Sequence, residues 1–113
     1  MTVQLDESVP ARLAKSLNAA GVRTLRFPNE WKGLKNGELL ARLRQSGFTC
    51  LVKCDKNLNY QQTISALNLA VVVLPRQRFL DLHPLLNVIA KAAGDARPGE
   101  TIVVADDGTV SKA

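Results

Sequence analysis

The segment LAVVVL, Leu69 to Leu74, most narrows what this chain can fold into, because every residue in it is apolar. A strand with one wet face alternates apolar and polar residues. An unbroken apolar run between turn signals is instead typical of a parallel strand that helices cover on both faces. The run is far too short to span a bilayer, which takes about 20 apolar residues in a helix. We therefore expect further parallel strands and covering helices elsewhere in the chain.

Strands and helices are expected to alternate around this central strand. The expected strands cover residues 3–6, 22–27, 48–55 and 69–74. The expected helices follow Ser8, run from Glu38 to about Gln45, occupy part of NLNYQQTISAL, and run from about Phe79 to Ala93. The segment GETIVVADDGTVSKA predicts a strand, an Asp107-Gly108 turn and a return strand. This order predicts an α/β fold with a mostly parallel sheet and helices on both faces.

The first expected helix carries local start and stop signals. Ser8 is a plausible N-cap, Pro10 suits the first turn, and Gly21 suits the residue just past the end of the helix. The length of 113 residues predicts a single domain, 1–113, with its core at about 3–94 and a C-terminal hairpin at about 100–111.

Composition and charge exclude several classes of protein. The chain is 46% hydrophobic and 22% charged, as in ordinary globular proteins, and its net charge of +5 suits either an RNA partner or a merely solvated surface. Cys50 and Cys54 lie four residues apart in an expected strand, about 13 Å, which is too far for a disulfide. We read them as core residues of a cytoplasmic protein. No signal peptide and no membrane association are expected.

Acidic residues gather where the expected strands end. Asp6 and Glu7 end the first strand, Asp55 ends the third, and Glu38 opens the helix before it. Each has a local explanation, as a helix cap, a first-turn acid or a turn residue. Together they fall on the carboxyl edge of a parallel sheet, where sites form in such folds. Carboxylates gathered there suit Mg²⁺ or Mn²⁺ and hydrolysis of a phosphodiester.

Four segments give the chain a resemblance to a known family. LDE-x-VP, W-x-G-L-K-N-G-E-L-L, L-V-x-x-D-K-N-L-x-Y-Q-Q and L-A-V-V-V-L together resemble the small stand-alone PIN-like proteins, bacterial relatives of the PilT N-terminus nuclease domain. The resemblance implies a three-layer α/β/α sandwich and a Mg²⁺- or Mn²⁺-dependent endoribonuclease. It also implies the toxin of a toxin–antitoxin pair, whose partners are RNA and a small antitoxin protein.

The resemblance also assigns the acidic residues. Asp6, Glu38 and Asp55 match the family's metal-binding acids, and Glu7 would assist catalysis or orient water. The chain departs from the family at two positions. Lys53 stands where the family usually has Thr, and Asn57 stands where many members have a further acid.

Basic and aromatic residues near the same edge are candidates for contact with RNA. Lys53, Lys56, Arg76 and Arg78 can bind the phosphate backbone. Trp31, flanked by Lys32 and Lys35, can stack on a base. It can equally pack on the core or into a homodimer contact.

Two alternatives to a nuclease remain open. The first is a catalytically weakened PIN-like module that binds RNA or a partner, which Lys53 and Asn57 favour. The second, less favoured, is a phosphoacceptor receiver-like domain, which also has an acidic pair after its first strand and an Asp after its third. Against the receiver, the fourth strand ends in Leu74-Pro75 rather than Ser or Thr, and IVVAD provides no lysine after the fifth.

Overall fold

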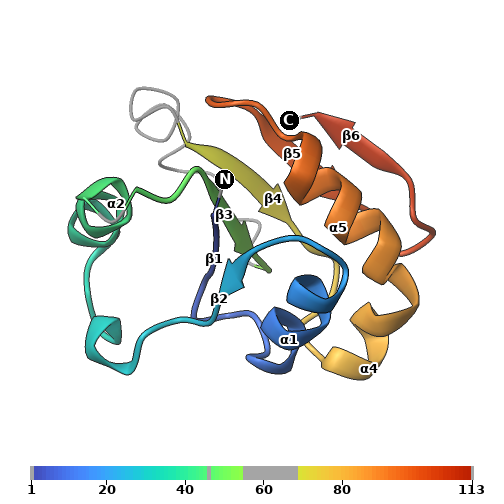
Figure 1. Cartoon of the computed structure of the whole chain (residues 1–113), viewed down its shortest axis with the longest axis horizontal. Helices are drawn as coiled ribbons and strands as arrows, with labels where there is room; N and C mark the ends of the chain where they lie inside the picture. The colour runs from blue at the N-terminus through green and yellow to red at the C-terminus, as the bar shows by residue number, and fades with distance from the viewer. Residues whose placement is uncertain (1, 46, 55–68, 113) are drawn as a thin grey trace.

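The structure is a computed structural model that describes residues 2–45, 47–54 and 69–112 (Figure 1). Its strands are β1 (Val3–Leu5), β2 (Thr24–Leu25), β3 (Cys50–Lys53), β4 (Ala70–Val73), β5 (Thr101–Val104) and β6 (Val110–Lys112). Its α-helices are α1 (Arg12–Ala19), α2 (Asn36–Gln45), α4 (Phe79–Leu82) and α5 (Leu86–Asp95). Two 3₁₀ helices, η1 (Asn29–Trp31) and η2 (His83–Leu85), join them.

The described strands form one sheet in the order β2-β1-β3-β4-β5-β6. Every neighbouring pair is parallel except β5 and β6, which form an antiparallel hairpin. The expectation of an α/β fold with a mostly parallel sheet is confirmed. Because the chain leaves β1 for β2 on one side and then returns to β3 on the other, the topology changes direction between β1 and β3.

One face of the sheet is apolar from end to end, and we call it the packed face. On β1 and β3 it presents Val3, Leu5, Cys50 and Val52, all at most 1% exposed. These side chains pack with residues of α1 and α5, among them Leu13, Leu17 and Ile89. Among the described residues, this face buries the larger set of apolar side chains and so contributes the larger share of hydrophobic stabilisation.

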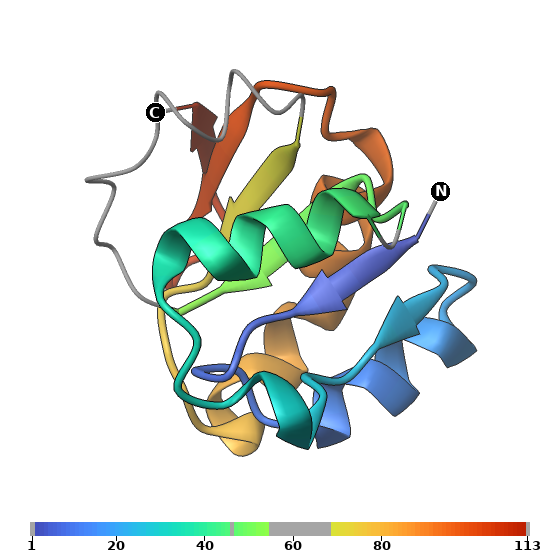
Figure 2. The same cartoon turned by 90° about the vertical axis from the view of Figure 1, so that its left-hand side faces the viewer.

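The opposite face is apolar only in part, and we call it the mixed face. Side chains alternate along a strand, so Gln4 of β1 and both Leu51 and Lys53 of β3 lie here. Leu51 packs with neighbours from β4 and with Trp31. The helix α2 lies on this side, away from α1 and α5 (Figures 1 and 2).

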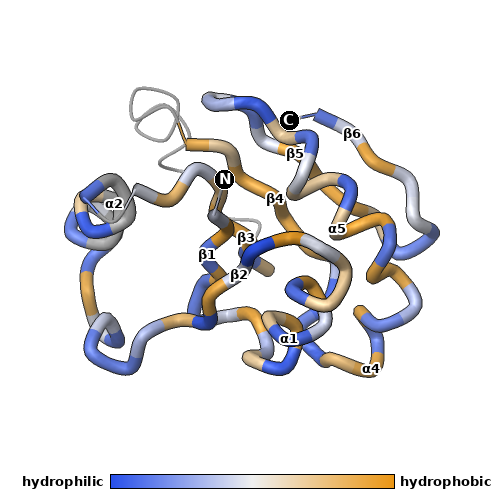
Figure 3. Tube along the Cα trace, viewed as in Figure 1, coloured by the Kyte–Doolittle hydropathy of each residue, from blue (hydrophilic) through white to orange (hydrophobic). Residues whose placement is uncertain are grey.

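The central strand confirms the interpretation of LAVVVL. All four residues of β4 are buried, with Ala70 and Val72 on the packed face and Val71 and Val73 on the mixed face. In Figure 3 this strand is coloured hydrophobic, whereas the segment around η1 is largely hydrophilic.

The end of α1 agrees with the expectation, and its start does not. Gly21 has a φ of 90°, and its N–H donates to the Asn18 carbonyl while that of Val22 donates to Leu17. These two bonds make the helix-terminating motif for which glycine is suited. The helix begins only at Arg12, and its N-cap residue Ala11 makes no side-chain capping bond. The prediction of Ser8 as N-cap and Pro10 in the first turn was wrong.

The last expected helix is interrupted. Residues 79–82 form α4, residues 83–85 form the 3₁₀ turn η2, and only residues 86–95 form α5. Pro84 lacks an N–H and its ring clashes with the preceding turn, which explains why the helix is interrupted here. The expected C-terminal hairpin is present, with Gly108 at a φ of 86° in the turn. The short helix expected in NLNYQQTISAL lies outside the described residues.

Among the described residues, no helix is long and apolar enough to cross a membrane.

Candidate functional site at the carboxyl edge of the sheet

The carboxyl edge, where β1, β3 and β4 end, carries Asp6. This residue follows β1 directly and is half-buried. Its N–H donates to the Val52 carbonyl at 2.8 Å, so the hydrogen bonding between β1 and β3 continues one residue past β1. The Asp6 backbone is therefore fixed at the point where the topology changes direction.

Ser8 fixes the Asp6 side chain. Its hydroxyl donates to Asp6 Oδ2 at 2.7 Å, and its own N–H donates to the same oxygen at 3.2 Å. The Cys54 N–H donates in turn to Ser8 Oγ at 3.1 Å. Ser8 thus joins the ends of β1 and β3. Within the described residues the other oxygen, Asp6 Oδ1, accepts no hydrogen bond and can take a further ligand.

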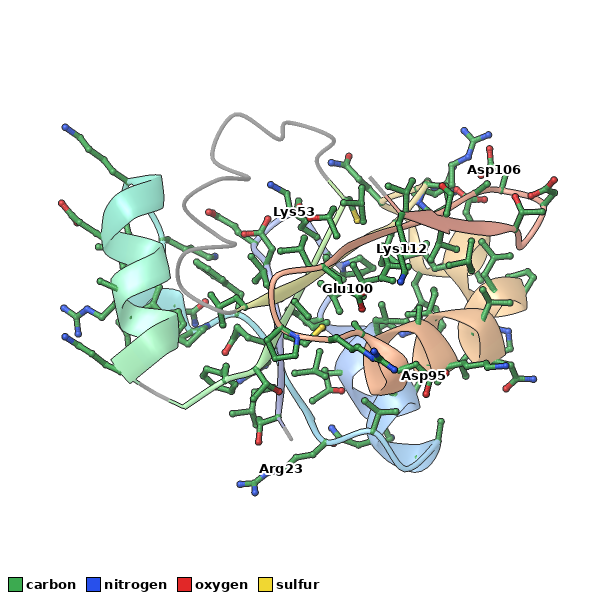
Figure 4. The ribbon with its side chains drawn as sticks, turned by 90° about the horizontal axis from the view of Figure 1, so that it is seen from above. Arg23, Lys53, Asp95, Glu100, Asp106 and Lys112 are labelled. Carbon is green, nitrogen blue, oxygen red and sulfur yellow. The ribbon has the colours of Figure 1, made fainter. Side chains whose placement is uncertain are left out.

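Lys53 is the last residue of β3 and is 2% exposed. Leu5 pairs with Val52, so continuing that register by one residue sets Asp6 beside Lys53 on the mixed face. In Figure 4, Lys53 lies well away from Arg23 and Asp95. Burying an ammonium group is costly unless other charges or dipoles compensate it. The register therefore places a buried cationic residue on the strand position next to Asp6.

The two cysteines behave as core residues, as predicted. Burial raises the pKa of Cys50 from 9.0 to about 12. Burial and the charge of Asp6 raise the pKa of Cys54 to about 11, against a smaller lowering by the Ser8 hydrogen bond. The Cys54 thiol donates to the Arg76 carbonyl at 3.1 Å. Both thiols stay protonated near neutral pH, so neither acts as a thiolate nucleophile or ligand.

The other predicted acids differ in what the structure says of them. Glu38 is exposed in the first turn of α2, and Figure 2 shows this helix starting on the side to which β1, β3 and β4 point. Glu7 is exposed next to Asp6. Asp55 lies outside the described residues, as does Lys56.

The described side chains alone do not make a complete site for a divalent ion. Residues 2–45, 47–54 and 69–112 contain no group of three His, Cys, Asp or Glu side chains that could hold a metal ion. Asp6 by itself suits a ligand role, because one carboxylate oxygen is anchored by Ser8 and the other has no hydrogen bond from the described residues.

Arg76 and Arg78, predicted to contact RNA, lie in different surroundings. Arg76 forms a two-point ion pair with Asp106, Nε to Oδ1 at 2.9 Å and Nη2 to Oδ2 at 3.0 Å. This pair raises the pKa of Arg76 and holds the guanidinium against the segment after β5. Arg78 is the exposed N-cap residue of α4. Of the two, Arg78 is the better placed to meet a phosphate.

Trp31 packs on the protein. It is half-buried, contacts the apolar cluster of the mixed face, and meets the Phe27 ring edge-on with centroids 6.1 Å apart. This is the packing alternative rather than an exposed stacking platform. Lys35 is exposed nearby in sequence, before α2.

Two residues of this region escaped the sequence interpretation. Ser8 was assigned to the helix, yet it bridges Asp6 and Cys54. Gln4 is 1% exposed, and its amide donates to the carbonyls of Leu5, Leu25 and Arg26. The sequence does contain a signal for Gln4. A long polar side chain at the centre of an apolar strand is expected to be buried, and a buried polar group needs hydrogen-bond partners.

Comparison with known proteins adds no relative, because no protein-family model, curated protein or solved structure matches the chain.

Proposed function

We propose that this chain is a PIN-like, metal-dependent endoribonuclease with a three-layer α/β/α sandwich fold, acting as the toxin of a toxin–antitoxin pair. The observation that carries the proposal is the locked Asp6 carboxylate. It stands at the topological switch between β1 and β3, with Ser8 on one oxygen. Ligand sites in open parallel sheets form at this kind of position.

The residues have separate roles in this proposal. Asp6, Glu38 and Asp55 hold Mg²⁺ or Mn²⁺, and Glu7 orients the attacking water. When bound, the ion supplies Lewis acidity toward the scissile phosphate. Lys56 and Arg78 bind the RNA backbone, whereas Lys53, at 2% exposed, is too deeply buried for that role. A small antitoxin would cover this edge.

The test of the proposal combines a thermal melt with an RNA cleavage assay. An ion that binds only the folded state stabilises it by RT ln(1 + [L]/Kd), about 2.7 kcal/mol at a hundredfold excess over Kd. We expect millimolar Mg²⁺ or Mn²⁺ to raise the Tm of the wild type and to support RNA cleavage. Asp6→Asn should abolish both effects.

Two further variants make this test specific. Asp95→Asn removes an exposed carboxylate at the end of α5, far from Lys53 in Figure 4, and should leave the metal response unchanged. Ser8→Ala keeps the Asp6 carboxylate but removes its anchor, so the metal response should persist at a raised apparent Kd. A wild-type Tm that ignores both ions would refute the nuclease proposal.

Lys53 supports a second candidate function, a PIN-like module that binds RNA or a partner without cleaving RNA. A buried ammonium beside Asp6 in register can supply the positive charge that an ion would otherwise supply. Under this candidate the wild type shows no metal response, and Lys53→Met creates one by removing the competing cation. Under the nuclease proposal the wild type already responds. The pair of melts therefore separates the two functions.

A further inference from the structure

A pocket of about 250 Å³ opens beside the candidate site, between the loop after β1 and the segment from β2 to η1. Its charged lining residues are Arg26, Lys32 and Glu7. Phe27 and Asn29 add an aromatic ring and an amide. With two cations and one carboxylate, the lining carries a net positive charge. Glu7 directly follows Asp6 in the sequence, so the pocket adjoins the candidate site.

The wall that carries Arg26 is held in place by a buried side chain. The Gln4 amide donates to the Arg26 carbonyl at 3.1 Å and to the Leu25 carbonyl at 3.3 Å. Gln4 is buried in β1, so it ties this wall to the sheet. A binding group on an anchored backbone loses less conformational freedom when it binds than one on a loose loop.

The aromatic wall of the pocket is also held in place, in this case by side-chain packing. Phe27 is half-buried and meets Trp31 edge-on at an interplanar angle of 82°. Trp31 in turn packs on the apolar cluster of the mixed face. The Phe27 ring is therefore an ordered apolar wall, with cations on either side of it in the sequence.

We propose that this pocket binds one nucleotide unit of a single-stranded RNA, next to the carboxylates of the candidate site. Arg26 and Lys32 bind the phosphate, since guanidinium and ammonium groups are its usual partners. The Phe27 ring packs against the base, and Asn29 hydrogen-bonds to the base edge. This inference rests on the proposed function and adds to it the path of the strand.

The size of the pocket agrees with such an occupant. Its volume of about 250 Å³ is just below the ~300–1,000 Å³ of pockets for drug-sized ligands, which suits a single nucleotide. The carboxylate of Glu7 repels a phosphate from its own side of the pocket. The phosphate is therefore directed toward Arg26 and Lys32.

The first measurement is RNA binding in EDTA, where metal-dependent cleavage cannot occur. The probe is a fluorescein-labelled oligouridylate of about eight nucleotides, followed by anisotropy at low salt. Loss of two phosphate contacts in Arg26→Ala/Lys32→Ala should weaken binding about tenfold or more. The matched control Lys15→Ala/Arg23→Ala removes two exposed cations from α1 and from the residue before β2, and should stay within about twofold of wild type.

The second measurement reports on the pocket itself. Trp31 is the only tryptophan in the chain, and its contact with Phe27 makes its emission sensitive to an occupant. We expect an unlabelled oligouridylate to change this emission saturably in the wild type and the control, but not in Arg26→Ala/Lys32→Ala. A parallel titration with uridine monophosphate shows whether a free nucleotide suffices or a strand is required.

The outcomes separate this inference from the nuclease proposal. Selective loss of binding in Arg26→Ala/Lys32→Ala without any metal-dependent cleavage by the wild type would leave the pocket assigned and remove the nuclease. Cleavage and binding by that variant equal to those of the control would overturn the pocket assignment alone. Binding of oligouridylate with unchanged Trp31 emission would overturn it as well. Far-ultraviolet circular dichroism confirms that the compared variants are folded.

Discussion

The two faces of β1 and β3 differ most at the carboxyl edge. On the packed face the side chains remain apolar to the last residue, Val3 and Leu5 on β1 and Cys50 and Val52 on β3. On the mixed face the apolar Leu51 gives way to Lys53, and Asp6 lies beside it in register. Both faces belong to the same strands, so the difference comes from the alternate positions of one short sequence.

This contrast separates residues that hold the fold together from residues available for chemistry. A polar group on the packed face would face α1 or α5 and lose its water. At the strand ends of the mixed face, Asp6 is instead hydrogen-bonded by Ser8, and Lys53 is its neighbour in register. Variants on the packed face should therefore change the free energy of unfolding, and variants at the strand ends of the mixed face should chiefly change binding.

The largest expected effect is that of Leu5→Ala. Leu5 is fully buried on the packed face, and truncation leaves a cavity that the two covering helices cannot close. We expect a loss of about 2–5 kcal/mol in the free energy of unfolding. Urea denaturation followed by circular dichroism measures it. RNA affinity, corrected for the folded fraction, should stay at the wild-type value, and a specific loss of affinity would break the contrast between the faces.

Gln4→Leu should have a smaller effect on stability and a second effect on the pocket. The substitution keeps the volume but leaves the carbonyls of Leu25 and Arg26 without the amide that now donates to them. We expect a loss of about 1–3 kcal/mol. Unlike Leu5→Ala, it should also weaken oligouridylate binding. Unchanged affinity would show that the Arg26 wall needs no such anchor.

High pH should probe the packed face through its thiols. The pKa values of Cys50 and Cys54 are raised from 9.0 to about 12 and about 11 in the folded protein. The unfolded chain therefore releases these protons first, and stability falls as pH rises from 9 toward 11. Near pH 7 the thiols contribute almost no pH dependence, because both the folded and the unfolded protein keep these protons. The variant Cys50→Ala/Cys54→Ala should show a shallower decline in the free energy of urea unfolding between about pH 8 and about pH 10, roughly a unit on either side of the ordinary thiol pKa of 9.0.

The smallest expected effect distinguishes the two arginines after β4. Arg76 is engaged by Asp106, whereas Arg78 is an exposed N-cap residue. Arg78→Gln should weaken RNA binding and reduce its salt dependence more than Arg76→Gln does, and the double variant should bind most weakly of the three. Neither change should measurably alter the Tm. An equal loss from both single variants would mean that RNA displaces Asp106 from Arg76.

Features that depend on short stretches of sequence were predictable. The apolar run at β4 predicted a strand that is buried on both faces. Gly21 predicted the end of α1, and Asp107-Gly108 predicted the hairpin turn. In each case the physical cause is local, either unbroken hydrophobicity or a backbone angle that glycine adopts readily.

Features that depend on the partner of a side chain were not predictable. Serine is a residue type that often caps helices. In the folded chain, however, the Ser8 hydroxyl accepts a hydrogen bond from the Cys54 N–H, which no local pattern indicates. The ion pair of Arg76 with Asp106, which lies in the segment after β5, was not predicted. Pro84 was visible in the sequence, and its effect on the last helix was underestimated. The sequence of one chain does not reveal which distant residue will contact a given hydroxyl or guanidinium group in the fold.

The strand order also determines in which order the strands can pair while the chain is being synthesised. Val3 of β1 pairs with Thr24 on one side and with Cys50 on the other, and Val71 of β4 pairs with Thr101. A growing chain can therefore give β1 only the two-residue neighbour β2 until β3 has left the ribosome. The most apolar strand, β4, keeps one edge unpaired until β5 has followed. Chains cut short before β5 should expose that edge to other chains, and aggregate more readily than the whole protein.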